Sequence, residues 1–233
     1  MMKPRLLDLF CCAGGAAEGY QIAGFDVTGV DIAAQPRYRG GRFIRADVMG
    51  LDLEFLSSFD AIHASPPCQG YSAMRHAPGA KHHDRLIGAV RERLELTGLP
   101  WIIENVEEAR SEMPGATMLC GSMFRLGAAG FQLQRHRLFI SNVEISAPCP
   151  CQHSAAGVVG IYGGHARVRS AKHGGRTTRD VWPNGHRPIA EEAMGMDWAT
   201  LAEMSEAIPP AYCAHLGAQL LQHLQNSSAQ LAA

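Results

Sequence analysis

The chain has 233 residues, 46% of them hydrophobic, which is enough for one large α/β domain or for one domain with a small appendage. Its formal net charge of −1 does not mark it as a nucleic-acid binder, and no apolar run approaches the ~20 residues of a membrane span. The seven cysteines lack the dense spacing of a secreted disulfide framework, and the basic amino terminus meets Asp8 too soon for a secretory signal. We therefore expect a soluble cytoplasmic protein.

The first residues follow the pattern of a nucleotide-binding βαβ unit. An apolar run at residues 5–10 leads through a turn with Gly14 and Gly15 into a helix-forming stretch, and a second strand, residues 25–30, ends at Asp31. In such units the turn lets a ligand approach the backbone, and the acid bonds ribose hydroxyls about 20 residues further on. An ordinary tight turn between strand and helix would contain the same glycines.

A third strand, residues 41–48, also ends in an acid, Asp47. This carboxylate either accepts a hydrogen bond from the exocyclic amine of an adenine or caps the turn that follows. The residues alone leave both interpretations open.

Residues 64–70, Ala-Ser-Pro-Pro-Cys-Gln-Gly, follow a strand at residues 59–63. The two prolines fix φ near −65° and remove two backbone donors, so the loop is stiff and holds Cys68 at one angle. The carboxyl end of a strand is where an α/β sheet usually places its chemistry. We interpret Cys68 as a nucleophile. The alternative is a small buried hydrophobe, the commonest fate of a free cysteine.

Residues 101–106 form a strand of buried character that carries Glu104 near its end. If Glu104 shares a sheet edge with Cys68, burial raises its pKa and favours the protonated form that a general acid needs. A helix cap or a structural salt bridge would use the same carboxylate. A helical pattern over residues 84–97, closed by Gly98, separates this strand from the Cys68 loop.

Residues 131–140 predict a single strand on which Arg135 and Arg137 share a face, because side chains alternate with period two. Two guanidinium groups that project together can hold a phosphate or a base edge. A charged edge strand that discourages aggregation would look the same.

From about Ala147 to Arg187 the chain is rich in Gly, Pro, His and Arg and shows little periodicity, so we expect a small irregular lobe. Basic residues over residues 163–187, interleaved with Tyr162, Trp182 and several histidines, indicate a nucleic-acid surface, and the alternative is a solvated loop. The basic residues are Arg167, Arg169, Lys172, Arg176, Arg179 and Arg187.

Three potential zinc ligands lie close together in Cys149-Pro-Cys151-Gln-His153. Structural zinc takes four ligands, usually with a gap of two to four residues in each pair. No fourth ligand is evident in the sequence, so we expect surface cysteines in a reducing compartment and no metal site.

The last part of the chain returns to regular structure. Helices are expected from near Pro188, over residues 200–205, and after Ile208-Pro209-Pro210, where leucines form one apolar stripe. Residues 226–233 are expected to form a frayed tail.

Taken in order, these motifs resemble those of the DNA cytosine-C5 methyltransferases, and the compact chain is similar to the small stand-alone enzymes of phages and bacteria. Residues 8–15 resemble the family's cofactor loop, residues 66–69 its nucleophile loop, residues 104–106 the acid that holds the target base, and Arg135-x-Arg137 its paired arginines. Residues 187–189 and 208–210 resemble the last two motifs.

Three positions depart from the family pattern. Cys12 stands where a glycine is usual, Leu133 where a glutamine is usual, and Ser205-Glu206 where Gly-Asn is common. The first and third departures bear on the cofactor pocket.

The resemblance implies a doubly wound, Rossmann-like α/β methyltransferase sheet with a small irregular target-recognition lobe. Residues 1–146 would bind S-adenosylmethionine, residues 147–187 would recognise the target, and residues 188–233 would return to the catalytic domain. The residues implied in catalysis are Cys68, Glu104, Arg135 and Arg137. Those implied in cofactor binding are Asp8, Phe10, Ala13, Gly14, Gly15, Asp31, Ile32, Asp47, Val48 and Pro66. Those implied in substrate binding are Ser65, Pro67, Gln69, Asn105, Arg167, Arg169, Lys172, Arg176 and Arg179.

The implied activity is methyl transfer from S-adenosylmethionine to a cytosine flipped out of double-stranded DNA, with Cys68 bonded to C6 and Glu104 to N3. Three alternatives remain: methylation of cytosine in tRNA, a nucleotide-level pyrimidine enzyme, and a DNA-binding relative that has lost catalysis, the last motivated by Cys12, Leu133 and Glu206. The oligomeric state stays open, with a monomer slightly favoured. The recognition sequence and any restriction partner also stay open.

Overall fold

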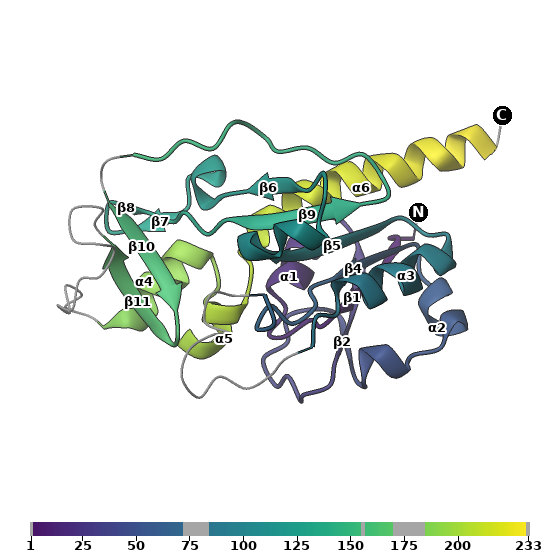
Figure 1. The fold of residues 1–233 in the computed structure, drawn as a ribbon, viewed down its shortest axis with the longest axis horizontal. Helices are drawn as coiled ribbons and strands as arrows, with labels where there is room; N and C mark the ends of the chain where they lie inside the picture. The colour runs from purple at the N-terminus through teal and green to yellow at the C-terminus, as the bar shows by residue number, and fades with distance from the viewer. Residues whose placement is uncertain (1, 72–83, 155–156, 170–184, 232–233) are drawn as a thin grey trace.

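The computed structural model describes residues 2–71, 84–154, 157–169 and 185–231, and Figure 1 shows their arrangement around one large sheet and one small sheet. Across these residues no helix combines the length and the apolar character needed to cross a membrane.

The large sheet has seven strands, and most of the candidate catalytic and cofactor-binding residues lie on its strands or on the loops that follow them. Its order is β3 (Arg42–Arg45), β2 (Asp26–Asp31), β1 (Arg5–Leu9), β4 (Ala61–Ala64), β5 (Trp101–Val106), β9 (Arg137–Ser141) and β6 (Thr117–Leu119). The first five strands are parallel, and β9 is antiparallel to both of its neighbours. From β1 the chain proceeds outward on one side to β2 and β3, and on the other side to β4 and β5. In open α/β sheets such a reversal marks where a ligand-binding crevice is expected, outside the carboxyl ends of β1 and β4.

Helices cover both faces of the large sheet, which confirms the predicted doubly wound class. Alternation along β1 explains this: Leu7 and Leu9 pack in a cluster with α2 (Leu53–Ser57) and α3 (Ile87–Thr97), whereas Leu6 packs in a cluster with α1 (Gly15–Ala23) and α6 (Pro210–Leu231). Short 3-10 helices span Val48–Gly50, Glu107–Glu112 and Gly121–Phe124.

Helices α1 and α6 approach each other closely because α1 presents glycines. A Cβ atom on Gly19 would lie 2.3 Å from the carbonyl oxygen of Pro210, and one on Gly15 would lie 2.4 Å from that of Ile208. Gly15 therefore allows the segment just before α6 to approach α1 closely. The apolar stripe predicted for the last helix is confirmed by buried Leu216 and Leu220.

The expected frayed tail is wrong as far as Leu231, because α6 continues to that residue. No glycine or proline interrupts residues 226–231. The hydroxyls of Ser227 and Ser228 also donate to the carbonyls of His223 and Leu224, one turn earlier, so they stay within the helix.

The small sheet corrects the expectation of an irregular lobe. Its order is β11 (His165–Arg169), β10 (Val158–Tyr162), β8 (Phe131–Gln132) and β7 (Gly127–Ala128), and it packs against α4 (His186–Met194) and α5 (Leu201–Glu206). Gly163 and Gly164, both with positive φ, form the turn of the β10–β11 hairpin. Strands and helices from outside residues 147–187 thus complete this lobe (Figure 1).

Candidate active site

The loop that carries Cys68 is held by hydrogen bonds from both neighbouring strands. The amide of Ser65 donates to the carbonyl of Leu9 on β1 at 3.1 Å, and the side-chain amide of Asn105 on β5 donates to the carbonyl of Pro66 at 2.8 Å. The carbonyl of Cys68 accepts from the amide of Tyr71 at 3.0 Å. Asn105, expected to bind substrate, therefore positions the loop.

Cys68 is half-buried at the end of β4 and lies within electrostatic range of Glu104. Burial raises the pKa of its thiol, and the Glu104 carboxylate raises it further, whereas Arg137 and Arg135 oppose the shift. The thiol is therefore mostly protonated at neutral pH.

Glu104 is buried beside Arg137. The Nε of Arg137 lies 3.0 Å from Oε1 of Glu104, and the same guanidinium donates through Nη1 to the carbonyl of His136 at 2.8 Å. Burial raises the pKa of Glu104 above its ordinary value, although Arg137, a hydrogen bond from Ser65 and the charge of Arg135 all lower it. The net direction favours the protonated carboxyl that was expected of a general acid.

A chain of hydrogen bonds that sequence reasoning missed leads from the core to Glu104. The hydroxyl of Tyr20 lies 3.0 Å from Nδ1 of His63, and Nε2 of His63 lies 2.9 Å from the hydroxyl of Ser65, which in turn bonds Glu104. Burial lowers the pKa of His63 to about 3, so its ring is neutral. Ser65, expected to contact substrate, is thereby engaged with Glu104.

The signal for this chain was present in the sequence. His63 is the one ionisable residue of the apolar strand β4, and it stands two positions before Ser65, where side chains of an extended strand share a face. The hydrogen bond from Ser65 lowers the pKa of Glu104, so Ser65 donates its hydroxyl proton to the carboxylate. The neutral ring of His63 then donates through Nε2–H to Ser65 and accepts at Nδ1 from Tyr20.

Arg135 is placed differently from the expectation. The predicted strand over residues 131–140 is wrong, because β8 ends at Gln132, β9 begins at Arg137, and the two strands belong to different sheets. The guanidinium of Arg135 is completely buried and donates to three backbone carbonyls. These are the carbonyls of Ala207 at 2.9 Å, Ile161 at 2.8 Å and Ser205 at 2.6 Å. Arg135 thus joins the lobe to the segment before α6.

The turn after β1 adopts left-handed backbone conformations at Phe10, Cys12 and Gly14, with φ values of 59°, 45° and 84°. Cys12, the departure from the family's glycine, keeps the conformation that glycine adopts readily, at a cost of roughly 1–2 kcal/mol. Its amide donates to Oδ2 of Asp31 at 3.0 Å, and the amide of Ala33 donates to Oδ1 at 2.9 Å. Each oxygen of Asp31 retains a lone pair for another donor.

Asp8 lies fully buried next to this turn. Neither of its oxygens has a hydrogen-bond partner among the described residues, and burial together with Asp31 raises its pKa. The carbonyl of Ala13 accepts a hydrogen bond from the indole of Trp198 at 2.9 Å. This bond links the turn after β1 to the segment between α4 and α5. A buried carboxyl without a partner marks this end of the crevice as suited to a polar or cationic group.

The remaining cofactor candidates lie at the carboxyl ends of the outer strands. Asp47 is exposed and caps the turn after β3, because its Oδ1 accepts from the amide of Met49 at 2.9 Å. The expected contact of Asp47 with an adenine stays a prediction. Ile32 is exposed and Val48 is buried. Pro66 is buried in the Cys68 loop. Gly14 is the N-cap residue of α1 and is packed against Arg39 and Tyr38.

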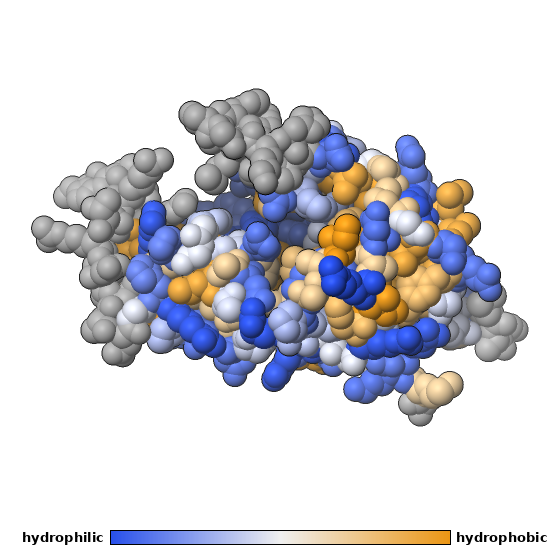
Figure 2. Space-filling view, turned by 90° about the horizontal axis from the view of Figure 1, so that it is seen from below, coloured by the Kyte–Doolittle hydropathy of each residue, from blue (hydrophilic) through white to orange (hydrophobic). Residues whose placement is uncertain are grey.

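Among the other substrate candidates, Pro67 is half-buried and Gln69 is exposed on the Cys68 loop, and Arg167 is exposed on β11. Arg169 ends β11, and Lys172, Arg176 and Arg179 lie outside the described residues. Figure 2 shows a hollow in the surface between the lobe at the left and the larger body at the right, with a hydrophilic floor.

Comparison with known proteins decides the family. Residues 4–121 match the family model described as C-5 cytosine-specific DNA methylase. The chain belongs to this family. The matched stretch contains the turn after β1, the Cys68 loop and Glu104, so the resemblance stated from the sequence is confirmed.

Solved structures of methyltransferases share the fold of this family member. A protein described as a DNA modification methyltransferase encoded within an E. coli prophage has a TM-score of 0.57 at 15% identity, and S. pombe Dnmt2 has 0.57 at 13%. Entamoeba histolytica EhMeth has 0.55 at 10%. Each comparison covers 96% of this chain and 99% of the other. A search of curated proteins found no match.

Proposed function

We propose that this member of the family methylates C5 of cytosine in double-stranded DNA through a transient covalent bond between Sγ of Cys68 and C6 of the base. The observation that carries the proposal is the convergence of a half-buried thiol on a braced loop with a buried carboxyl whose pKa is raised. The two groups suit the two tasks of the reaction, nucleophilic attack and neutralisation of the ring.

Cys68 overcomes the low nucleophilicity of C5. Its thiolate forms the Sγ–C6 bond, the C5–C6 double bond is lost, and C5 becomes an electron-rich enamine carbon. Glu104 in its protonated form bonds N3 and compensates the negative charge that develops on the ring. After methylation, loss of the C5 proton and elimination of Cys68 restore the aromatic ring and the free thiol.

Arg137 and Ser65 orient the acid in this scheme. Arg137 bonds one oxygen of Glu104, and Ser65 contacts the same carboxyl from the Cys68 loop. The acid and the nucleophile are therefore fixed relative to each other before any base enters, which favours catalysis through preorganisation.

S-adenosylmethionine, when bound, supplies an electrophilic methyl group. The crevice fits it in its polar groups: the free lone pairs of Asp31 suit ribose hydroxyls, and the buried carboxyl of Asp8, whose pKa is raised, has no hydrogen-bond partner among the described residues and so can bond a polar group of the cofactor. Phe10, Gly14, Asp47 and Pro66 lie at the same strand ends. These residues would bind and orient the cofactor.

The target atom is inaccessible inside a duplex, so the base has to be flipped into the site. The hollow between the lobe and the large sheet (Figure 2), with Arg167 exposed on the lobe, supports an approach of DNA from this side. Arginines of the lobe such as Arg167 would neutralise phosphates, and binding should weaken as salt rises.

The test replaces Cys68 by alanine. The variant should still bind DNA but show no methyl transfer and no covalent trapping on 5-fluorocytosine DNA, whereas Cys149→Ala, which removes an exposed thiol, should behave like the wild type. Normal turnover by Cys68→Ala would remove Cys68 from the proposed role.

The same assay separates the alternatives. DNA, RNA of matching sequence and free dCMP serve as acceptors for the wild type. Transfer to RNA and not to DNA would establish the RNA enzyme, and transfer to dCMP would establish a nucleotide-level enzyme. DNA binding without transfer or cofactor binding would identify a relative that has lost catalysis.

A further inference from the structure

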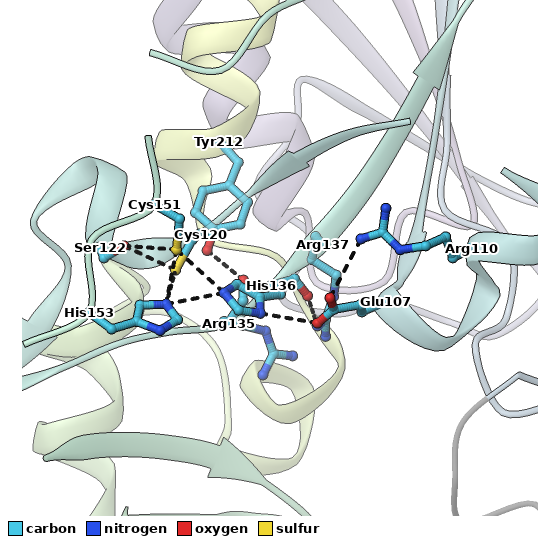
Figure 3. Close-up of polar contacts among 10 residues, drawn as sticks. All are labelled: Glu107, Arg110, Cys120, Ser122, Arg135, His136, Arg137, Cys151, His153 and Tyr212. Carbon is cyan, nitrogen blue, oxygen red and sulfur yellow. Dashed lines mark hydrogen bonds and ion pairs between the residues drawn. The ribbon is translucent and has the colours of Figure 1, made fainter. Parts of the chain in front are cut away.

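Four side chains outside the candidate active site converge on one point beside β6 and β9. They are Cys120, His136, Cys151 and His153, and their donor atoms all lie within 4.8 Å of one another. Figure 3 shows the two thiols and the two imidazole rings turned toward each other. The donors come from three segments: the end of β6, the residue before β9, and the chain that leads to β10.

We propose that Cys120, His136, Cys151 and His153 bind a structural zinc ion. Two thiolates and two imidazoles without oxygen donors form a set that selects zinc over calcium or magnesium. Four protein ligands leave no open position, which distinguishes a structural site from a catalytic one.

The distances support a tetrahedral arrangement. With ordinary Zn–S and Zn–N bond lengths, the edges of the tetrahedron are about 3.6 Å between sulfur and nitrogen and about 3.3 Å between two nitrogens. The corresponding contacts are Cys120 Sγ–His153 Nε2 at 3.5 Å, Cys151 Sγ–His136 Nε2 at 3.6 Å, His136 Nε2–His153 Nε2 at 3.2 Å, and Cys151 Sγ–His153 Nε2 at 2.9 Å. Three of the four match closely, and the last would lengthen by a rotation of His153, which is exposed.

Neighbouring groups already hold the ligands as a metal site requires. The Nδ1 of His136 lies 3.1 Å from Oε2 of Glu107, which leaves Nε2 directed at the centre of the cluster. The hydroxyl of Ser122 donates to Sγ of Cys120 at 3.2 Å and lies 3.5 Å from Sγ of Cys151. A carboxylate behind a histidine and a hydroxyl beside thiolates are typical outer partners of metal ligands.

The structure also explains why the four ligands could not be recognised from the sequence. Cys149, which the sequence pattern placed with Cys151 and His153, is exposed, and its sulfur lies instead 3.8 Å from the carbonyl of Met123. The other two ligands, Cys120 and His136, lie in distant segments that only the antiparallel pairing of β6 and β9 brings together.

The position of the site indicates its role. His136 lies between Arg135, which joins the lobe to the segment before α6, and Arg137, which pairs with Glu104. An ion that fixes His136 would also fix the backbone of its neighbours Arg135 and Arg137, and it would anchor the chain that enters β10. Zinc would thus brace the lobe against the large sheet.

The experiment measures metal on the whole protein, purified under reducing conditions. The wild type should contain about one zinc per chain, and X-ray absorption should show two sulfur and two nitrogen neighbours. A zinc content near zero after incubation with zinc and removal of the excess, or a shell made of oxygen and nitrogen alone, would overturn the proposal. The wild-type measurement does not depend on how any variant folds.

Two neighbouring cysteines provide a matched pair of variants. Cys151→Ser should lose the zinc, whereas Cys149→Ser, two positions away in the same segment, should keep it. A chelator should lower the melting temperature of the wild type and of Cys149→Ser, and added zinc should restore it. Loss of zinc from both variants, or from neither, would contradict the assignment.

Glu107, the hydrogen-bond partner of His136, allows a test in which zinc binding is weakened but not abolished. Glu107→Gln should retain the fold but weaken zinc binding ~10–100-fold in competition with a chromophoric chelator. Unchanged affinity in Glu107→Gln would contradict its support of His136.

Discussion

Arg137 and Glu104 form a buried ion pair diagonally across strands β9 and β5, with 9% and 8% of their side chains exposed and 3.0 Å between Nε and Oε1. The strand register pairs Arg137 with Val106 and Glu104 with Phe139, so the two charged residues are diagonal neighbours. A carboxyl in this position has a raised pKa from burial and a nearby cation to limit the cost of its charge.

Removing both partners of this pair should cost less stability than the sum of the two single removals. Arg137→Met leaves Glu104 buried without its cation and should destabilise the protein by about 3–5 kcal/mol. The double variant Glu104→Gln/Arg137→Met should be less destabilised than the sum of the two single changes. Urea unfolding of the wild type, both single variants and the double variant measures this coupling. Strict additivity would show that the two groups do not interact energetically.

His63 should make the stability of the protein sensitive to acid. Its pKa is about 3 in the folded chain against 6.5 when unperturbed, because the ring is buried. Between these values the unfolded chain binds more protons, so stability is fully present above about pH 6.5 and is lost as the pH falls. Between about pH 7 and about pH 4 the loss should be on the order of 3 kcal/mol from this residue.

Urea unfolding at both pH values compares the wild type with His63→Gln, which cannot titrate, and with His223→Gln on the exposed surface of α6. The wild type and His223→Gln should lose stability in acid by a similar amount, and His63→Gln should lose less. Equal pH dependence in all three proteins would refute a neutral buried His63.

Arg135→Lys should separate a structural role from a catalytic one. Lysine cannot span the three carbonyls of Ile161, Ser205 and Ala207, so buried acceptors lose their donors at about 1–3 kcal/mol each. We expect a clearly lower melting temperature, but a turnover per active molecule within a few-fold of the wild type. Glu104→Gln should instead lower turnover ~10²–10⁴-fold.

Trapping on 5-fluorocytosine DNA counts the active molecules for this comparison. An Arg135→Lys protein of wild-type stability and strongly reduced turnover would support the catalytic role that the resemblance implied for Arg135.

The parts of the fold that the sequence predicts correctly are those with a clear local pattern of apolar residues. Apolar runs of strand length gave β1, β2, β4 and β5, and helical spacing of apolar residues gave α3 and the buried stripe of α6. The lobe was read as irregular because its hairpin strands are short and are flanked by Gly157, Gly163 and Gly164. Arg135 and Arg137 were assigned to one strand because period-two alternation does not reveal where a strand ends.

By itself, the sequence determined the order of the motifs, the stiff Pro66-Pro67 loop that carries Cys68, and the acid at the end of a buried strand, because neighbouring residues fix these features. Only the tertiary structure decided that Arg137 pairs with Glu104, that Arg135 is engaged by backbone carbonyls, and that His63 supports Ser65. It also gathered Cys120, His136, Cys151 and His153. Such contacts join segments far apart in the chain, and strand pairing and packing, rather than local preference, set which side chains meet.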